Sequence, residues 1–137
     1  MPAAIEHLIP HRAPMQWLTA LTRCDATTAT ATACLGEKDF PVNGGTVLET
    51  ALVECIAQTV AAALGHRAQA GGENGRAAAN GMLIAISNFK ILSHAVAGKV
   101  LHIEVREARR LGPMLLVNGK ITCEGTTIAT GDLSLYA

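Results

Sequence analysis

The chain has 137 residues, half of them hydrophobic, and its 11 Lys and Arg residues are balanced by 11 Asp and Glu residues. A chain of this length is expected to form one domain that buries roughly two-thirds of its unfolded surface. Nucleic-acid binding is not expected, because it needs a basic surface and often aromatic rings, and only 3% of the residues are aromatic. The N-terminus lacks a basic region followed by an apolar run, so we expect no signal peptide and a cytoplasmic protein.

Two strands are predicted at the start of the chain, over residues 15–23 and 27–35. The second alternates Thr and Ala with a period of two, which is typical of a strand with one buried face. The short turn between them indicates an antiparallel pair. Residues 36–45 are rich in Gly, Pro and Asn and are expected to form a loop.

The longest predicted element is a helix over residues 46–66, around which the rest of the chain is expected to pack. Thr46 and Glu49 have the spacing of a capping box at the helix start. Gly65 is expected to end the helix, because glycine tolerates the left-handed conformation of a C-terminal cap. Apolar residues on nearly all sides indicate a buried helix. Glu49 and Glu54 make the segment a poor membrane span, so no membrane association is expected.

Glu54 and Gln58 are the unusual residues of this helix. They are four residues apart and therefore lie on the same side, within its most apolar part. Because burying an unpartnered carboxylate is costly, Glu54 is expected to line a cavity or to meet hydrogen-bond donors. Buried acids cluster at functional sites; the alternative is a structural acid satisfied by backbone donors.

Four more strands are predicted after the helix. They are expected at residues 81–91, 99–109, 114–124 and 127–136, after a glycine-rich surface loop at residues 70–76 that fits no phosphate-binding motif. The first is mostly apolar and is expected to be buried on both faces for part of its length. The second alternates and is expected to have one wet face. Asn118-Gly119 could instead form a hairpin turn, but a continuous strand there matches its neighbours in length.

The four cysteines show no C-x-x-C motif and no metal-like spacing with the five histidines. We expect free thiols, which are usual in cytosolic proteins. His94 and His102 are interpreted as turn or surface residues. Strands packed around one buried helix make an α+β domain, in which one face of the helix can still need cover from a second subunit.

Five motifs, in this order, resemble those of the hot-dog-fold 3-hydroxyacyl-(acyl-carrier-protein) dehydratases. They are Leu-Ile-Pro-His-Arg-Ala-Pro-Met at 8–15, Phe-Pro at 40–41, Glu-Cys-Ile-Ala-Gln at 54–58, Ile-Ser-Asn-Phe-Lys at 86–90 and Gly-x-Leu-x-x-Tyr at 131–136. The resemblance covers nearly the whole chain. It looks closest to the small dehydratase-like proteins of aryl polyene biosynthesis.

The resemblance implies an antiparallel sheet wrapped around the central helix, in a homodimer or higher oligomer with sites at the subunit interface. The ligand implied is an acyl thioester of an acyl carrier protein or of coenzyme A, held in a tunnel beside the helix. The family's reaction removes water from a 3-hydroxyacyl thioester to give a trans-2-enoyl thioester. It serves fatty-acid or aryl polyene biosynthesis and needs no metal or redox cofactor.

Elimination of water requires a base for the C2 proton, an acid for the 3-hydroxyl and donors for the thioester oxygen. Glu54 matches the family's helix acid, but the His that precedes Phe-Pro in the family is Asp39 here. Glu54 and Asp39 are therefore predicted as the catalytic residues, although Asp39 also fits a solvated loop acid. The residues predicted to contact the substrate, through the amide next to Glu54, the turn before the helix and the tunnel wall, are Gln58, Phe40, Gly44, Gly45, Thr46, Gly81 and Met82.

The missing His leaves three hypotheses open. In the first, Glu54 gives and takes the proton in turn, alone or with Asp39. In the second, the protein is inactive and is the partner subunit of a related active dehydratase, to which it contributes a surface or half a tunnel. In the third, it hydrolyses acyl thioesters, as hot-dog thioesterases do with a helix carboxylate that acts on water.

Overall fold

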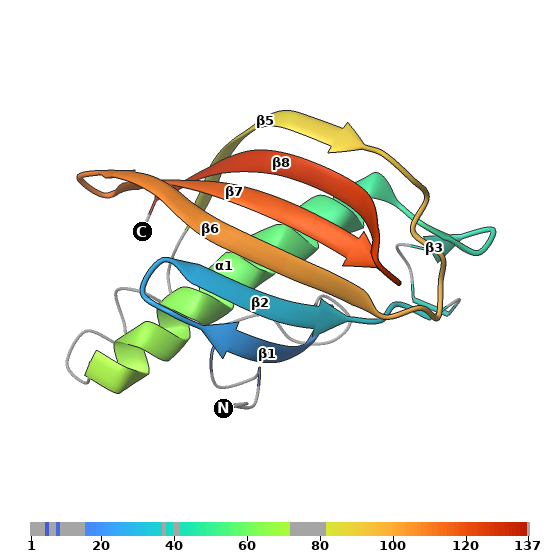
Figure 1. Cartoon of the computed structure of the whole chain (residues 1–137), viewed down its shortest axis with the longest axis horizontal. Coiled ribbons are helices and arrows are strands. Elements are labelled where there is room, and N and C mark those ends of the chain that lie inside the picture. Colours follow the sequence, from blue (N-terminus) through green and yellow to red (C-terminus); the bar gives the residue numbers. More distant parts are fainter. Residues whose placement is uncertain are drawn as a thin grey trace.

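The computed structural model describes residues 5, 8, 16–36, 38–39, 42–71 and 82–136, with backbone alone at 70–71 and 82–84. One six-stranded antiparallel sheet curves around a single long helix, which confirms the hot-dog arrangement implied by the sequence motifs (Figure 1). The elements are β1 (Leu18–Cys24), β2 (Thr28–Ala33), β3 (Val42–Asn43), β4 (Thr46–Val47), α1 (Glu49–Gly71), β5 (Met82–Ile91), β6 (Leu101–Leu111), β7 (Met114–Cys123) and β8 (Thr126–Tyr136). The strand order in the large sheet is β1-β2-β6-β7-β8-β5.

The first two strands form the antiparallel pair that the sequence predicts, with Leu18 opposite Ala33 and Cys24 opposite Ala29. The Thr/Ala alternation of β2 has the predicted effect. Its alanines face the helix and are almost fully buried, whereas its threonines lie on the other face. Alanine suits these positions because its small side chain lets the sheet approach the helix closely.

The helix exists as predicted, but its predicted start at residue 46 is wrong. Thr46 pairs with Asn43 across a two-residue hairpin whose central residues, Gly44 and Gly45, have φ of +59° and +79°. Glycine adopts this left-handed conformation without steric cost, which favours the tight turn. The first helical turn closes on the carbonyl of Leu48 instead, so Thr46 lies too early to act as the cap.

The predicted end at Gly65 is also wrong, because α1 continues to Gly71 and takes up the first two residues of the predicted surface loop. Residues 72–76 of that loop lie outside the described residues. Gly65 instead permits close packing, since a Cβ atom there would meet the carbonyl oxygen of Leu8. Glycine at position 65 is therefore explained by its close contact with another segment, not by the end of the helix.

The last three strands form a meander, and β7 runs unbroken through Asn118, which pairs with Arg106 on β6 and Asp132 on β8. The continuous strand is thus confirmed over the hairpin alternative. Gly119, the next residue, faces the helix. A Cβ atom there would lie 2.5 Å from Cγ2 of Ile56, so glycine lets α1 lie against the middle of the sheet.

β5 was expected to be buried on both faces for part of its length, and over residues 85–91, where its side chains are described, it is not. It lies at the edge of the sheet, with β8 as its strand partner, and residues 85–88 are exposed, Ile86 by 43%. The apolar composition of this segment does not distinguish an edge strand from a central one. Asn88 has φ +52° where the pairing shifts register between Ser87 and Lys90, and its amide donates to Asp132 Oδ2 at 3.0 Å.

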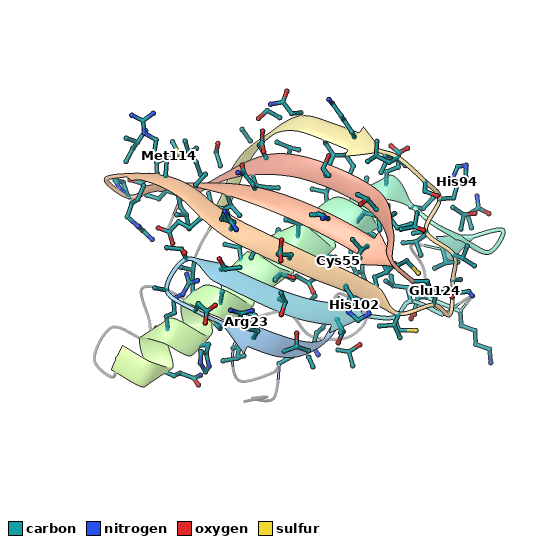
Figure 2. The ribbon with its side chains drawn as sticks, viewed as in Figure 1. Arg23, Cys55, His94, His102, Met114 and Glu124 are labelled. Carbon is teal, nitrogen blue, oxygen red and sulfur yellow. The ribbon has the colours of Figure 1, made fainter. Side chains whose placement is uncertain are left out.

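The core lies between α1 and the concave face of the sheet, and the convex face carries mostly polar side chains. Figure 2 shows Cys55 on the helix beneath the sheet, and His102 on the sheet. Cys55 is fully buried, whereas His102 is exposed. An ionisable side chain that meets both solvent and apolar surface is therefore expected along the flanks or at the ends of the helix.

Candidate functional site

Gln58 ties the helix to the start of β1. Its side chain is completely buried, and its Oε1 accepts hydrogen bonds from the backbone N–H of Trp17 at 3.0 Å and of Leu18 at 3.4 Å. Its Nε2 donates to Glu54 Oε1 at 3.5 Å. The Gln58 amide thus connects the start of β1 to Glu54. Its position next to Glu54 is the one that the four-residue spacing predicts.

Glu54 lies on the half-buried side of α1, together with Val53 and Ala57. The carboxylate is therefore only partly buried, although the apolar residues around it in the sequence suggest full burial. One of its oxygens meets the Gln58 amide, whose own position is fixed by the backbone of β1. A carboxylate held in this way on a rigid helix is positioned to handle a proton.

Asp39 closes a turn. Its Oδ2 accepts a hydrogen bond from the backbone N–H of Gly36 at 2.7 Å, and its own N–H donates to the Gly36 carbonyl at 3.0 Å. Its carbonyl in turn accepts from the Val42 N–H at 3.1 Å. This exposed carboxylate therefore shapes the loop that leads to β3, as the solvated-loop interpretation suggests.

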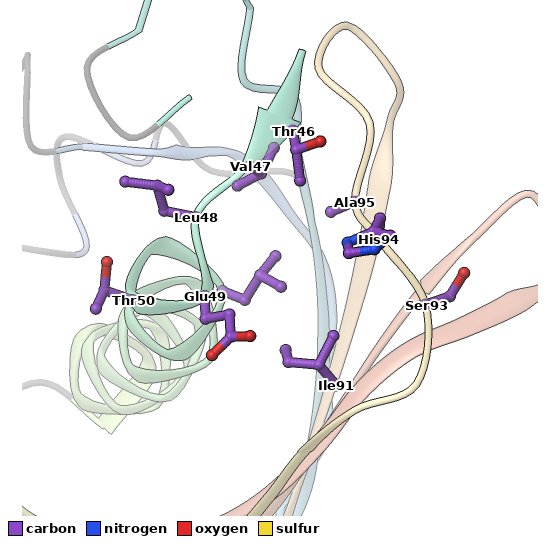
Figure 3. A pocket seen from close by; sticks show the side chains of 10 residues that line it. Thr46, Val47, Leu48, Glu49, Thr50, Ile91, Ser93, His94 and Ala95 are labelled. Atoms are coloured by element: carbon purple, nitrogen blue, oxygen red, sulfur yellow. The ribbon is translucent and has the colours of Figure 1, made fainter. Parts of the chain in front are cut away.

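A cavity of about 450 Å³ lies between the start of α1 and the turn that follows β5 (Figure 3). It is lined by Thr46, Val47, Leu48, Glu49, Thr50, Leu52, Ile91, Ser93, His94 and Ala95. Of the residues that the sequence singled out as site candidates, Thr46 is in this lining. Glu54 is not, because five residues along a helix turn the side chain by about 140° away from Glu49.

The cavity has two titratable lining residues, Glu49 and His94. Figure 3 shows the Glu49 carboxylate reaching in from the helix and the His94 imidazole from the opposite wall. The sequence interpretation placed His94 in a turn, correctly, but gave it no role. No local motif marks it, because its relation to Glu49 depends on how the turn after β5 folds against the start of α1.

Gly44, Gly45 and Thr46 were predicted to donate hydrogen bonds from the start of the helix. Because the helix begins at Glu49, these three residues precede it. These residues form the β3–β4 hairpin, and the Gly45 carbonyl accepts a hydrogen bond from Ala97 N–H at 2.8 Å. The N–H groups of the first helical turn belong to Glu49 and the residues after it.

Phe40 and Gly81 lie outside the described residues. Met82 begins β5 opposite Tyr136, and its side chain is not among those described.

Burial raises the pKa of the Cys55 thiol to about 12, with the neighbouring Glu54 carboxylate adding a smaller effect in the same direction. Thiolates are the reactive form of cysteine, so this buried thiol is poorly suited to nucleophilic chemistry. Within the described ranges, no three His, Cys, Asp or Glu side chains gather in a way that could hold a metal ion.

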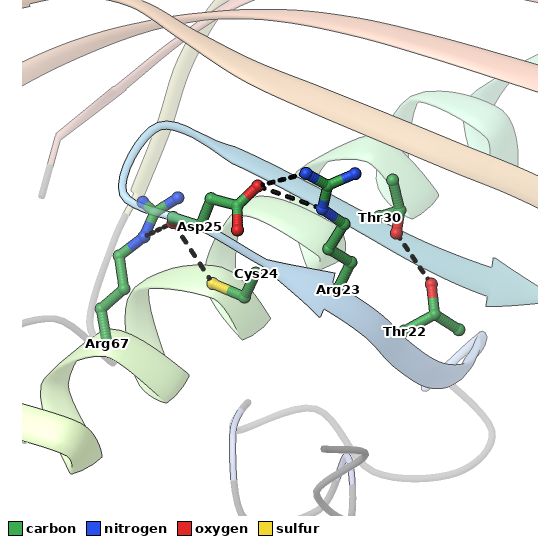
Figure 4. Close-up of polar contacts among 6 residues, drawn as sticks. All are labelled: Thr22, Arg23, Cys24, Asp25, Thr30 and Arg67. Carbon is green, nitrogen blue, oxygen red and sulfur yellow. Dashed lines mark hydrogen bonds and ion pairs between the residues drawn. The ribbon is translucent and has the colours of Figure 1, made fainter.

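A second polar cluster lies at the other end of the helix (Figure 4). Arg23 pairs with Asp25 at 2.9 Å, and the Asp25 carbonyl accepts a hydrogen bond from Arg67 Nε at 2.8 Å. Arg67 also lies 3.7 Å from Glu107 on β6. These contacts fasten the β1–β2 turn to the helix and to β6, which is a structural role.

Solved structures with the same fold include dehydratases and thioesterases. The dehydratase heterocomplex ApeI:P from Xenorhabdus doucetiae matches with a TM-score of 0.88 and 22% identity, covering 98% of this chain and 90% of that chain. The PaaI protein of E. coli matches with a TM-score of 0.68 and 14% identity, covering 85% and 81% of the two chains. A hypothetical thioesterase from Streptococcus pneumoniae, solved with coenzyme A, matches with 0.64 and 12%, covering 85% and 82%.

No curated protein matches the sequence. Among the helices that the structure describes, none has the length and apolar character to cross a membrane. The family model of the ApeP dehydratases matches residues 3–137, which is nearly the whole sequence. The chain therefore belongs to the ApeP-like dehydratase family.

Proposed function

We propose that the protein takes part in the removal of water from a 3-hydroxyacyl thioester to give a trans-2-enoyl thioester, in aryl polyene or fatty-acid biosynthesis. The observation that carries this proposal is the match of the dehydratase family model to residues 3–137. The thioester would be carried by an acyl carrier protein or coenzyme A. The protein would work in the cytoplasm.

Glu54 is the carboxylate that we propose to protonate the departing hydroxyl. Its support is the family motif around it, together with the hydrogen bond from Gln58, which is itself held by the Trp17 backbone. A positioned acid or base contributes about 10²–10⁴-fold to a rate. Asp39 remains a proposed helper, but its contacts with Gly36 favour a structural role for that side chain.

The proposed working form is a dimer or higher oligomer with sites shared between subunits. Glu54 and the helix-start cavity lie on opposite flanks of one helix, so a substrate in the cavity would need its carboxylate from a second chain. That chain is either a copy of this one or a related dehydratase. The heterocomplex in the similar Xenorhabdus doucetiae structure favours the second arrangement as an alternative.

The test is formation of the enoyl thioester, measured by its absorbance, with thiol release trapped in parallel. The wild type is compared with Glu54→Gln and with the control Glu104→Gln, an exposed carboxylate on β6. We expect enoyl product from the wild type and the control, and a loss of about 100-fold or more in Glu54→Gln. A Glu54→Gln variant as fast as the wild type would exclude this role for Glu54.

The alternatives give different results in the same assay. Thiol release that depends on Glu54 would identify a thioesterase, a function favoured by the thioesterases among the similar folds. A folded protein silent in both assays, which gains activity when a related dehydratase is added, would identify a partner subunit.

A further inference from the structure

The proposed reaction needs a base for the C2 proton in addition to the acid that protonates the hydroxyl. The sequence offered Asp39 at the position where related dehydratases have His. In the structure its carboxylate accepts a hydrogen bond from Gly36 N–H at 2.7 Å and closes a turn. The base must therefore be sought among the other titratable groups that face an apolar site.

The helix-start cavity has the properties that such a site requires. Its walls include the apolar side chains of Val47, Leu52 and Ile91, and its volume of about 450 Å³ is in the range of small-ligand sites. Glu49 and His94, its two titratable groups, enter from opposite walls (Figure 3). An imidazole is the side chain that most often takes and gives protons near neutral pH.

His94 is held in place although it lies in a turn. The residue before it, Ser93, donates its N–H to the Ile128 carbonyl of β8 at 3.2 Å. The residue after it, Ala95, is buried and accepts a hydrogen bond from Val47 N–H at 2.9 Å. The backbone on both sides of His94 is thus held in place, by the sheet on one side and by the wall of the cavity on the other, and the imidazole extends from it as an exposed side chain.

His102 provides a useful contrast. It lies on the convex face of the sheet, in a hollow lined by polar side chains such as Thr30, Glu104 and Lys120. An acyl chain gains nothing from such a surface, because it buries no apolar area there. The two histidines therefore differ in the feature that matters for an acyl substrate.

We propose that His94 is the base that removes the C2 proton of an acyl thioester bound in the helix-start cavity, with Glu49 facing the imidazolium that forms. This inference rests on the proposed function. It assigns to the turn after β5 the imidazole that the loop before Phe40 lacks.

The bound substrate is a 3-hydroxyacyl thioester. Neutral His94 takes the C2 proton, and the C2–H electron pair becomes the C2–C3 π bond. The C3–O bond breaks, and the hydroxyl takes a proton from the protonated form of Glu54, so that water leaves. His94 then loses its proton to solvent and Glu54 regains one. Because Glu54 projects from the other flank of its own helix, it comes from a second subunit.

The first experiment compares His94→Ala with the control His102→Ala in the enoyl-thioester assay, in the absence and presence of added imidazole. We expect His94→Ala to lose about 100-fold or more in kcat, and His102→Ala to keep the wild-type rate. Imidazole should restore part of the lost rate in His94→Ala and none in Glu54→Gln, which a merely structural role of His94 would not produce. Thermal melting checks that each variant is folded.

Two results separate this inference from the proposed function. An active wild type with an equally active His94→Ala, or a loss that imidazole leaves unchanged, would overturn the role of His94 and leave the dehydratase function intact. A wild type that forms no enoyl product would overturn both.

The second experiment tests whether His94 and Glu54 come from different subunits. His94→Ala and Glu54→Gln are co-expressed in equal amounts, and mixed dimers then contain one site with both native residues. About a quarter of the wild-type activity should return, since half of the dimers are mixed and each has one intact site of two. Two inactive variants that stay inactive together would refute the shared site.

Discussion

The buried side-chain oxygen of Gln58 accepts a hydrogen bond from the backbone N–H of Trp17, at 3.0 Å and across 41 residues of sequence. It also lies 3.4 Å from the Leu18 N–H. The first strand of the sheet is therefore attached to the middle of the helix by one amide. The same amide contacts Glu54, so the position of the proposed acid depends on the docking of β1.

Replacing Gln58 by Met is expected to destabilise the protein by about 1–3 kcal/mol, because the N–H groups of Trp17 and Leu18 lose their buried acceptor. Methionine keeps the volume and flexibility of the side chain, which isolates the lost hydrogen bonds. The measurement is the free energy of unfolding in urea. Glu104→Met, at an exposed position of β6, is the control and should change it by less than about 0.5 kcal/mol. Equal effects at both positions would show that the β1 contacts contribute little.

Gly119→Ala is expected to destabilise the protein by about 1–3 kcal/mol, because its Cβ would lie 2.5 Å from Cγ2 of Ile56. Chemical denaturation of Gly119→Ala, Ile56→Ala and the double variant measures the coupling between the two positions. The double variant should lose less than the sum of the single losses, since truncating Ile56 makes room for the new methyl group. Gly36→Ala, whose Cβ would be 3.9 Å from Asp39 Oδ2, is the control and should be nearly neutral. Strict additivity would contradict the clash.

The elements of the fold follow from local patterns in the sequence. Alternation in residues 27–35 and 99–109 predicts strands with one buried face, and the apolar run from residue 46 predicts a buried helix. These features depend on neighbouring residues along the chain. The helix ends were misjudged because Thr46 and Gly65 carry the residue types of caps while making tertiary contacts. Thr46 forms a β-bridge with Val96, and Gly65 packs against Leu8.

The arrangement of the candidate site residues could be predicted in part, for the same reason. The spacing of Glu54 and Gln58 places them together, because a helix determines which residues are neighbours. The relation of Glu49 to His94 could not be read in this way. The two residues are 45 positions apart in sequence, and no periodic pattern places both of them around one cavity.

Stability should fall above pH 9 through the Cys55 thiol. Burial raises its pKa from 9.0 to about 12 in the folded protein, so between these values the unfolded chain releases a proton that the folded chain keeps. The unfolded state then binds fewer protons, and the free energy of unfolding falls as pH rises, by at most about 1.4 kcal/mol per pH unit from one group. Below pH 9 the stabilisation is fully present.

The measurement is urea denaturation between pH 8 and 10.5 of the wild type and Cys55→Ala, whose side chain does not titrate. The decline above pH 9 should be shallower in Cys55→Ala. Cys34→Ala, at an exposed thiol, is the matched control and should decline as the wild type does. Parallel curves for wild type and Cys55→Ala would show that this thiol does not contribute to alkaline destabilisation.

Gly65→Ala separates two opposing expectations about the helix. Alanine has the higher helix propensity by about 1 kcal/mol, so α1 taken alone would be stabilised. The added Cβ would collide with the carbonyl oxygen of Leu8, which is backbone and cannot rotate away as a side chain does. We expect a net loss of about 1–2 kcal/mol in the free energy of unfolding, since overpacking costs more than the propensity gain. Ala57→Gly, on the half-buried face of the same helix, is the comparison. Propensity alone predicts opposite signs for the two variants, whereas the contact with Leu8 predicts that both are destabilised.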